Sequence, residues 1–233
     1  MRALVFHQAT LPRTLPFALF MAFIAVDEII RHLANLGLVS ISHTSLYYLY
    51  PIKTIAVAAL IYKYRREYEE LDVKDLADIK TTCIVLLVGI LSCVIWVMMD
   101  WTIVGSGSPP GFNPTHLPVG PIRFIMTQFR IAGAVLVVPL MEELFWRSFL
   151  LRYIIDADFK SVKIGQFSWP SFIFTLLLFG LEHHFVLVGM VVGAVYSMIL
   201  YKTRSLAQCV LSHAVTNLAL AGYVLYTGKW YFW

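Results

Sequence analysis

The chain has 233 residues, of which 59% are hydrophobic and only 14% are charged, whereas soluble globular domains average about 25% charged residues. This composition excludes an ordinary soluble domain and predicts an integral membrane protein surrounded by a lipid bilayer. The net charge of +4 gives no reason to expect nucleic acid as a partner, because the basic residues lie in short loops, where they orient helices.

Apolar segments of about 20 residues, the length that crosses a bilayer as a helix, follow one another along the chain. We expect about seven of them, roughly at residues 11–33, 46–62, 82–101, 122–155, 169–184, 186–201 and 206–226. An N-terminus inside and a C-terminus outside put the basic loops on one side, as the positive-inside rule requires. The predicted fold is an all-α polytopic membrane protein with N-in/C-out topology.

We interpret the charged residues in the first half of the chain as mainly structural. Asp27 and Arg31 are four residues apart, so they can pair on one helix face, either as a neutralised helix end or as part of a cavity. Lys53 lies near the start of the second segment, where a lysine can reach the lipid headgroups. We expect the highly charged linker 63–80 to be a solvated loop without chemistry, and the Gly/Pro-rich connector 102–121 to be a loop as well.

The fourth apolar segment carries the first motif. It is too long for one untilted span, and Pro139 removes a backbone hydrogen bond, so we expect a tilted or broken helix. Glu143 and Arg147 are four residues apart and can pair on one face, whereas Glu142 is rotated by about 100°. Glu142 would then be a free carboxylate in an apolar site and a candidate general base. The alternative is a helix-anchoring salt bridge with the other glutamate facing a loop.

The later segments supply polar partners for this motif. His183 and His184 point about 100° apart on a helix, so at most one should face the same cavity. His213 and Asn217 are four residues apart and present two hydrogen-bond donors, which can stabilise an oxyanion. We therefore expect a buried Glu/His/His/Asn cavity that suits amide hydrolysis, provided that the fourth segment is broken or tilted or that the fifth segment starts below the membrane interface. A metal site with Glu and His ligands is the alternative chemistry.

Two further features of the last third of the chain concern helix packing and the membrane interface. Gly189 and Gly193 form a G-x-x-x-G spacing, which allows close helix approach in membranes. The tail 228–233 is rich in aromatic residues, which is typical of an interfacial anchor.

Together, the three motifs resemble the signature of a known family. They read Glu142-Glu143-x-x-x-Arg147, Phe179-x-x-x-His183 and His213-x-x-x-Asn217. In this order they are similar to the CPBP (CAAX protease and bacteriocin-processing, Rce1/Abi-like) intramembrane proteases, over about residues 130–220. Trp146 and the aromatic tail are most similar to the bacterial CAAX-protease-related group associated with exosortase systems.

The resemblance implies a glutamic-type intramembrane endopeptidase of the bacterial cytoplasmic (inner) membrane, with a membrane-associated peptide or protein as substrate. In such an enzyme Glu142 would activate water with help from His183, while His213 and Asn217 would hold the oxyanion. His183 is favoured over its neighbour because it alone lies four residues after a phenylalanine of the motif.

In the same scheme Glu143 and Arg147 would form the structural ion pair. Residues 1–121 would be accessory helices and 122–226 the catalytic core of one membrane domain over 1–233. No cofactor is expected. The alternatives are a zinc-dependent membrane metalloprotease, a non-catalytic scaffold or immunity protein, and a transporter.

Overall fold

The computed structural model describes residues 2–100 and 111–233, and over these residues the chain forms helices and loops without strands. The α-helices are α1 (Arg2–Asn35), α2 (Leu49–Lys63), α3 (Ile79–Met98), α4 (Pro121–Ala132), α5 (Val138–Glu143), α6 (Leu151–Tyr153), α7 (Trp169–Glu182), α8 (Val186–Thr203) and α9 (Leu206–Thr227). The 3₁₀-helices are η1 (His43–Tyr48), η2 (Arg65–Glu67), η3 (Val73–Ala77), η4 (Pro114–His116), η7 (Phe159–Ser161) and η8 (Trp230–Phe232). This confirms the all-α class. The predicted loop 102–121 lies outside the described residues as far as residue 110.

Six helical segments of the described residues are long and apolar enough to cross a membrane. They are Ala9–Asn35, Thr44–Lys63, Ile79–Met98, Pro121–Tyr153, Val186–Thr203 and Leu206–Thr227. The segment expected at 169–184 is the shorter apolar helix α7, with 14 residues.

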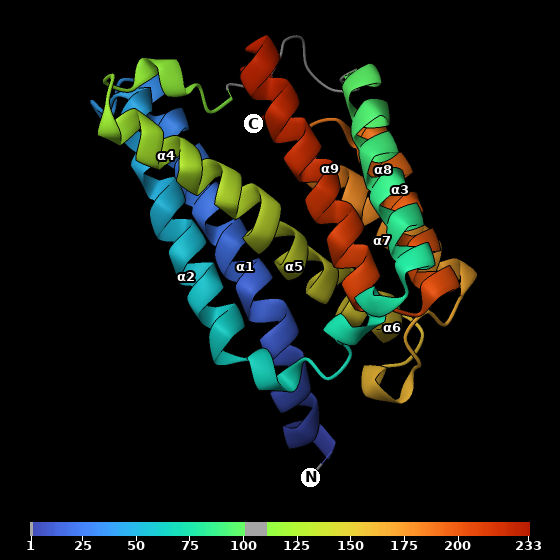
Figure 1. Ribbon diagram of the computed structural model, residues 1–233. Helices are drawn as coiled ribbons and strands as arrows, with labels where there is room; N and C mark the ends of the chain where they lie inside the picture. Colours follow the sequence, from blue (N-terminus) through green and yellow to red (C-terminus); the bar gives the residue numbers. More distant parts are fainter. Residues whose placement is uncertain (1, 101–110) are drawn as a thin grey trace.

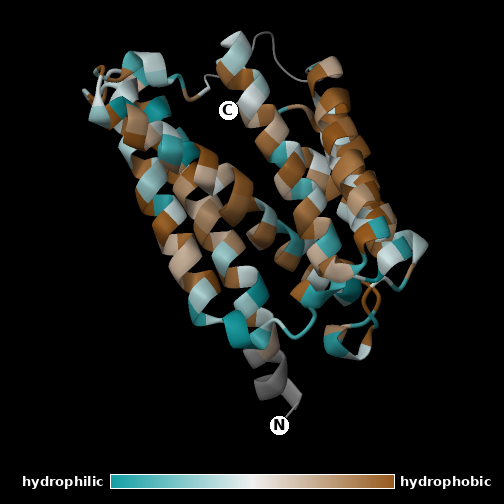
Figure 2. Ribbon diagram, in the orientation of Figure 1, coloured by the Kyte–Doolittle hydropathy of each residue, from teal (hydrophilic) through white to brown (hydrophobic). Residues whose placement is uncertain are grey.

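Large apolar side chains are exposed along α3, among them Ile84, Leu87 and Leu91. Figure 2 shows that hydrophobic residues predominate along the helices and that hydrophilic segments lie near their ends. Soluble monomers rarely expose such patches, so the chain is a multi-pass membrane protein. The number of crossings and the N-in/C-out orientation stay predictions.

The helices form two groups that meet at the middle of the molecule (Figure 1). Helices α1, α2 and α4 make one group, and α3, α7, α8 and α9 make the other. Helix α5 and the turns after it run between them and contact both α1 and α9. Residues from both groups therefore reach the space around α5, where the first motif lies.

Small residues allow the closest helix contacts in the second group. A Cβ atom on Gly193 of α8 would lie 2.8 Å from Phe179 Cδ1 of α7, and one on Gly189 would lie 3.1 Å from Gly180 Cα. The G-x-x-x-G spacing thus supports close approach of α7 and α8, as predicted. In the same way, a Cβ on Gly89 of α3 would lie only 2.6 Å from the carbonyl oxygen of Ser212 on α9.

The long run from Pro121 to Tyr153 is one continuous helical segment that contains two π-helical parts, η5 (Gly133–Val137) and η6 (Leu144–Leu150). At the end of η5 the N–H of Val138 donates to the carbonyl of Gly133, five residues back. The next residue is Pro139, which has no N–H and cannot continue the backbone pairing. A wide π-helical turn thus precedes the acidic pair, in place of the expected break of the helix.

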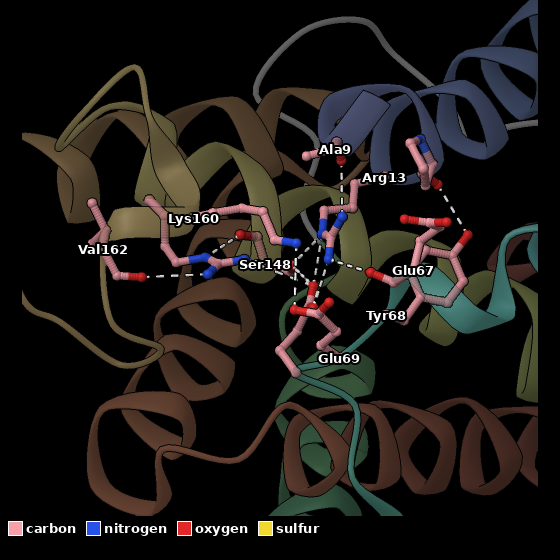
Figure 3. Close-up of polar contacts among 11 residues, drawn as sticks. Ala9, Arg13, Glu67, Tyr68, Glu69, Ser148, Lys160 and Val162 are labelled. Carbon is pink, nitrogen blue, oxygen red and sulfur yellow. Dashed lines mark hydrogen bonds and ion pairs between the residues drawn. The ribbon is translucent and has the colours of Figure 1, made fainter. Parts of the chain in front are cut away.

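A buried cluster around Arg13 ties α1 to this run (Figure 3). The Arg13 guanidinium, whose side chain is 1% exposed, donates to the two carboxylate oxygens of Glu70 at 2.7 and 2.6 Å and to Ser148 Oγ at 3.1 Å. Ser148 also donates to Glu70, and Arg152 Nη2 lies 3.7 Å from Glu70 Oε1. The cluster therefore joins α1, the 63–80 linker and η6.

This cluster adds a buried contact to the 63–80 linker, most of whose residues are exposed, as expected for a solvated loop. Tyr68 is buried and donates from its hydroxyl to the carbonyl of Pro12, while the Glu70 side chain is only 8% exposed. The physical reason is the buried arginine on α1, because a charge in an apolar setting needs a paired, hydrogen-bonded partner. The linker is therefore anchored to α1 through these two residues, and Glu70 supplies that carboxylate.

Candidate active site

Glu142, His183, His213 and Asn217 all line one cavity of about 300 Å³. Glu142 lies on α5, His183 follows the last residue of α7, and the other two lie on α9. The four side chains that the motifs singled out are therefore brought together, although they come from three separate helices. His184 is exposed, so the structure places the first of the two adjacent histidines in the cavity wall.

Beneath the cavity lies a fully buried ion pair. Arg147 Nη1 is 3.2 Å from Glu143 Oε1, and both side chains are 0% exposed. Arg147 also donates from Nη2 to the carbonyl of Gly193 at 3.0 Å, and its guanidinium lies 4.5 Å from the ring centroid of Phe179. The predicted i,i+4 pair is present, and it links the α5 region to both α7 and α8.

His213 is held by the same carboxylate. Its Nδ1 lies 2.9 Å from Glu143 Oε1, so Nδ1 carries a proton that is donated to this oxygen. Its ring stacks on Tyr196 at 4.7 Å between centroids. With Nδ1 fixed, the other ring nitrogen, Nε2, points toward Glu142, whose Oε2 is 3.9 Å away.

Glu142 differs from its neighbour in having no arginine partner. The residue is 5% exposed, and Oε2 makes no hydrogen bond with the described residues. Buried carboxylate oxygens are nearly always hydrogen-bonded, and an unpaired one calls for an explanation. The two adjacent glutamates therefore divide as expected, with Glu143 in an ion pair and Glu142 facing the cavity.

His183 is oriented by the end of α7. Its Nδ1 lies 2.7 Å from the carbonyl oxygen of Phe179, and donation to this oxygen leaves Nε2 as the free nitrogen. The ring packs against Phe179 and Trp96, with centroid distances of 4.7 and 5.2 Å. Because α7 has 14 residues and is only about 21 Å long, it is shorter than a hydrocarbon core of about 30 Å. Because α7 ends before it would cross the whole hydrocarbon core, His183 can lie inside the membrane.

Asn217 has a structural bond that the sequence did not reveal. Its Nδ2 donates to the carbonyl of Ala134 at 2.8 Å. The π-helical offset seen at Val138 would pair this carbonyl with the N–H of Pro139, which proline lacks. Asn217 therefore satisfies a carbonyl exposed by the π-helical turn, and only its second N–H is available to the cavity.

The cavity wall includes two cations that the sequence reasoning missed, Lys53 and Arg130. Lys53 was expected to reach the headgroups, but its Nζ instead lies 4.1 Å from the ring centroid of Phe20. Both cations occur in apolar segments with no acidic residue three or four positions away. The absence of an acidic partner nearby in the sequence is the signal that could have identified both cations as candidate cavity residues.

The C-terminal tail also contributes to the wall. Phe232 and Trp233 line the cavity, the Tyr231 hydroxyl donates to Asp100 Oδ2 at 2.9 Å, and the N–H of Phe112 donates to the carbonyl of Trp233 at 3.2 Å. The tail is thus packed onto the protein, and its expected role as an interfacial anchor stays a prediction. Trp146 is also fixed by its surroundings, since its Nε1 donates to Glu182 Oε2 at 3.0 Å.

Metal ligation was the alternative chemistry for these residue types. In the parts of the chain that the structure describes, no three His, Cys, Asp or Glu side chains are gathered so that they could hold a metal ion. Glu142, His183 and His213 share a cavity wall, and both the expectation of no cofactor and the zinc alternative stay predictions.

Residues 124–219 match the sequence model of a protein family described as type II CAAX prenyl endopeptidase Rce1-like. The matched part is somewhat less than half of the chain and contains all three motifs. No curated protein and no solved structure matches the chain. The family match confirms the resemblance carried by the motifs, whereas the exosortase-associated group stays a prediction.

Proposed function

We propose that the protein is an intramembrane endopeptidase in which Glu142 activates the attacking water. The match of residues 124–219 to the Rce1-like family model supports a CAAX-type membrane protease that acts on a protein substrate at the membrane. One observation carries the mechanistic proposal. A buried carboxylate oxygen without a partner among the described residues faces the free ring nitrogen of His213 at 3.9 Å.

This spacing suits a water molecule between the two groups. A distance of 3.9 Å is too long for a direct hydrogen bond, for which about 2.7–3.2 Å is usual. A water can contact both Glu142 Oε2 and His213 Nε2 at once. Glu142 then takes a proton from this water as it attacks the carbonyl carbon of the scissile bond, and the proton passes to the departing amine. His183 Nε2, free on the same cavity wall, assists in holding the water.

The developing oxyanion needs donors. Asn217 offers the N–H that is not bound to Ala134, and His213 offers Nε2–H in the imidazolium form, for which it takes up a proton from solvent before the attack. In that form the Glu143 carboxylate, 2.9 Å from Nδ1, is the counter-charge, much as the aspartate of a catalytic triad supports its imidazolium. Donors placed in a dry cavity before reaction stabilise a transition state more than donors in water do.

The Glu143–Arg147 pair contributes to the reaction indirectly. It touches His213 through Glu143 and the backbone of Gly193 through Arg147. Its role in the proposal is to position His213 relative to Glu142. The site belongs to a multi-pass membrane protein, for which we propose the bacterial cytoplasmic membrane. No step of the proposed mechanism requires a metal.

The proposal is tested by comparing the membrane peptides of cells that express the wild type or Glu142→Gln. We expect at least one membrane protein to lose a cleavage in the variant, because glutamine cannot accept the proton. The two histidines give a matched pair, since His183→Ala should lose the same cleavage and His184→Ala should retain it. Unchanged cleavage in Glu142→Gln, at equal protein levels, contradicts the proposal.

A further inference from the structure

A groove lies between α3 and α8, which run side by side (Figure 1), apart from the cavity that contains Glu142. The volume of the groove is about 1000 Å³, compared with about 300 Å³ for that cavity. Helix α8 lies between the two, because Val192 and Tyr196 line the cavity, whereas Val191 and Met198 line the groove. The three motifs and the proposed reaction use no residue of the groove wall, so the groove needs an explanation of its own.

Most of the groove wall is apolar. It includes Ile84, Val85 and Val88 of α3 and Val191, Val195 and Met198 of α8. Ile84 and Met198 are 54% and 49% exposed, which suits side chains in contact with a bilayer. On α8 the wall extends from Val191 to Thr203, which is about 18 Å along a helix. Half of the hydrocarbon core is about 15 Å thick, so the groove has the length of one lipid leaflet.

Charges of both signs lie at one end of the groove. Lys74 and Asp75 belong to η3, Asp78 directly precedes α3, and Lys202 lies in the last turn of α8. All four residues are exposed. Among the described residues, no ion pair joins these lysines to these aspartates. This end is therefore complementary to a ligand that carries both a negative and a positive group.

A buried glutamine fixes the charged end to the helices. Gln208 of α9 is 1% exposed and donates from Nε2 to the carbonyl of Asp75 at 3.0 Å and to Thr82 Oγ1 at 2.9 Å. The Thr82 hydroxyl in turn donates to the carbonyl of Leu76 at 3.0 Å. These hydrogen bonds hold η3 against α3 and α9. The charged side chains thus project from a preformed backbone, which lowers the entropic cost of binding a ligand.

We propose that the groove binds one molecule of phosphatidylethanolamine, with an acyl chain between α3 and α8 and the headgroup at the charged end. The headgroup phosphate accepts from Lys74 and Lys202, and the primary ammonium donates to Asp75 and Asp78. Phosphatidylglycerol offers no positive group to the two aspartates. Phosphatidylcholine has a quaternary ammonium without an N–H to donate. The proposal goes beyond the proposed function and does not depend on it.

The test measures lipid binding by the purified protein in detergent micelles. Phosphatidylethanolamine, phosphatidylcholine and phosphatidylglycerol with identical acyl chains are added in equal amounts, and native mass spectrometry measures the bound fraction of each. We expect phosphatidylethanolamine to bind at least about 5-fold more tightly than either of the others, the effect of one well-formed exposed ion pair. Equal binding of the three lipids, or a preference for phosphatidylglycerol, overturns the proposal.

Substitution of the two aspartates tests the headgroup contacts. Asp75→Asn with Asp78→Asn removes both carboxylates, and asparagine can still cap α3 as Asp78 does. The ratio of phosphatidylethanolamine to phosphatidylcholine binding should therefore fall close to one. Asp158→Asn, the same change at an exposed aspartate outside the groove, should leave the ratio unchanged. A ratio that survives the double substitution overturns the proposal. If the double variant does not fold, Asp75→Asn alone must lower the ratio.

Substitution of Ala194 tests the position of the acyl chain. Ala194 of α8 lines the groove, and a phenyl ring there would fill the space of the chain. In Ala194→Phe, binding of phosphatidylethanolamine should fall to the level of phosphatidylcholine, a loss of about 5-fold. Ala59→Phe, at an exposed alanine of α2, should bind as the wild type does. Unchanged binding by a folded Ala194→Phe variant overturns the proposal. Since cleavage is not measured, such a failure leaves the proposed function standing.

Discussion

The buried cluster that ties α1 to the helix carrying Glu142 should respond sharply to the loss of one charge. In Glu70→Gln an amide replaces the carboxylate that accepts from Arg13 at 2.7 and 2.6 Å and lies 3.7 Å from Arg152. Glutamine keeps one acceptor oxygen but leaves both arginines without a counter-charge. The Arg13 and Glu70 side chains are 1% and 8% exposed, so water can do little to compensate.

The magnitude follows from this burial. Removing one partner of a buried ion pair typically destabilises a protein by about 3–5 kcal/mol. We expect about 3 kcal/mol, the lower end, because the amide still accepts a hydrogen bond. For a chain of this size each kcal/mol shifts the melting temperature by about 2–4 °C. The predicted loss for Glu70→Gln is therefore about 6–12 °C.

The assay is thermal unfolding of the purified protein in a mild detergent. Its matched control is Glu69→Gln, the same substitution at the adjacent residue. The Glu69 side chain is 73% exposed and 3.3 Å from Lys160, and surface pairs of this kind contribute at most about 1 kcal/mol. Equal melting temperatures for the two variants refute the reasoning.

The same cluster sets a pH dependence. Burial alone would raise the pKa of the Glu70 carboxyl, but the hydrogen bond and charge of Arg13, together with Ser148, hold this pKa below its usual range. A lowered folded-state pKa contributes stability above the unfolded-state value, which is about 4.3 for glutamate. The stability difference between the wild type and Glu70→Gln should therefore be constant near neutral pH and narrow as the pH falls below about 4. A difference that widens there contradicts this sign.

Three further outcomes are expected. Gly89→Ala should destabilise the packing of α3 on α9, because its Cβ would lie 2.6 Å from a backbone oxygen of Ser212; an unchanged melting temperature counts against that contact. Glu143→Gln should lower the melting temperature and also slow cleavage, because Arg147 and the protonated form of His213 lose their counter-charge; full activity would show that His213 needs no such support. Treatment with EDTA should leave cleavage unchanged, and a loss that zinc restores would revive the metalloprotease alternative.

The positions of the helices could be predicted well from the sequence. Long apolar runs with charged or Gly/Pro-rich flanks are strong signals in membrane proteins, and the segment expected at 206–226 is helix α9, Leu206–Thr227. A local disturbance near Pro139 could also be predicted, because the missing N–H of proline acts locally, but it takes the form of a π-helical turn within a continuous helix. The short helix α7, Trp169–Glu182, likewise lies within the segment expected at 169–184.

Side-chain partners could be predicted only where they are close in sequence. The i,i+4 pairs Asp27–Arg31 and Glu143–Arg147 are present as expected. The bond between Arg13 and Glu70 joins residues 57 positions apart, and periodicity along one helix carries no information about such contacts. For this reason the contacts that Tyr68 and Glu70 of the linker make with α1 could not be predicted.

The motifs pointed to residues that line one cavity, but not to the hydrogen bonds between them. The motifs pointed to Glu142 and His213 without revealing that Glu143 is shared between Arg147 and His213. They also did not indicate that one N–H of Asn217 donates to the carbonyl of Ala134. These hydrogen bonds depend on how α5 and α9 pack against each other. The motifs carry no information about that packing.

The most direct test of the proposed mechanism measures cleavage and stability in the same preparation of Glu142→Gln. Because the Glu142 Oε2 atom has no hydrogen-bond partner among the described residues, its replacement should leave the melting temperature almost unchanged. General-base catalysis contributes about 10²–10⁴-fold, so cleavage of a membrane peptide by the reconstituted protein should fall by at least about 100-fold. A stable variant that cleaves at the wild-type rate would contradict the account.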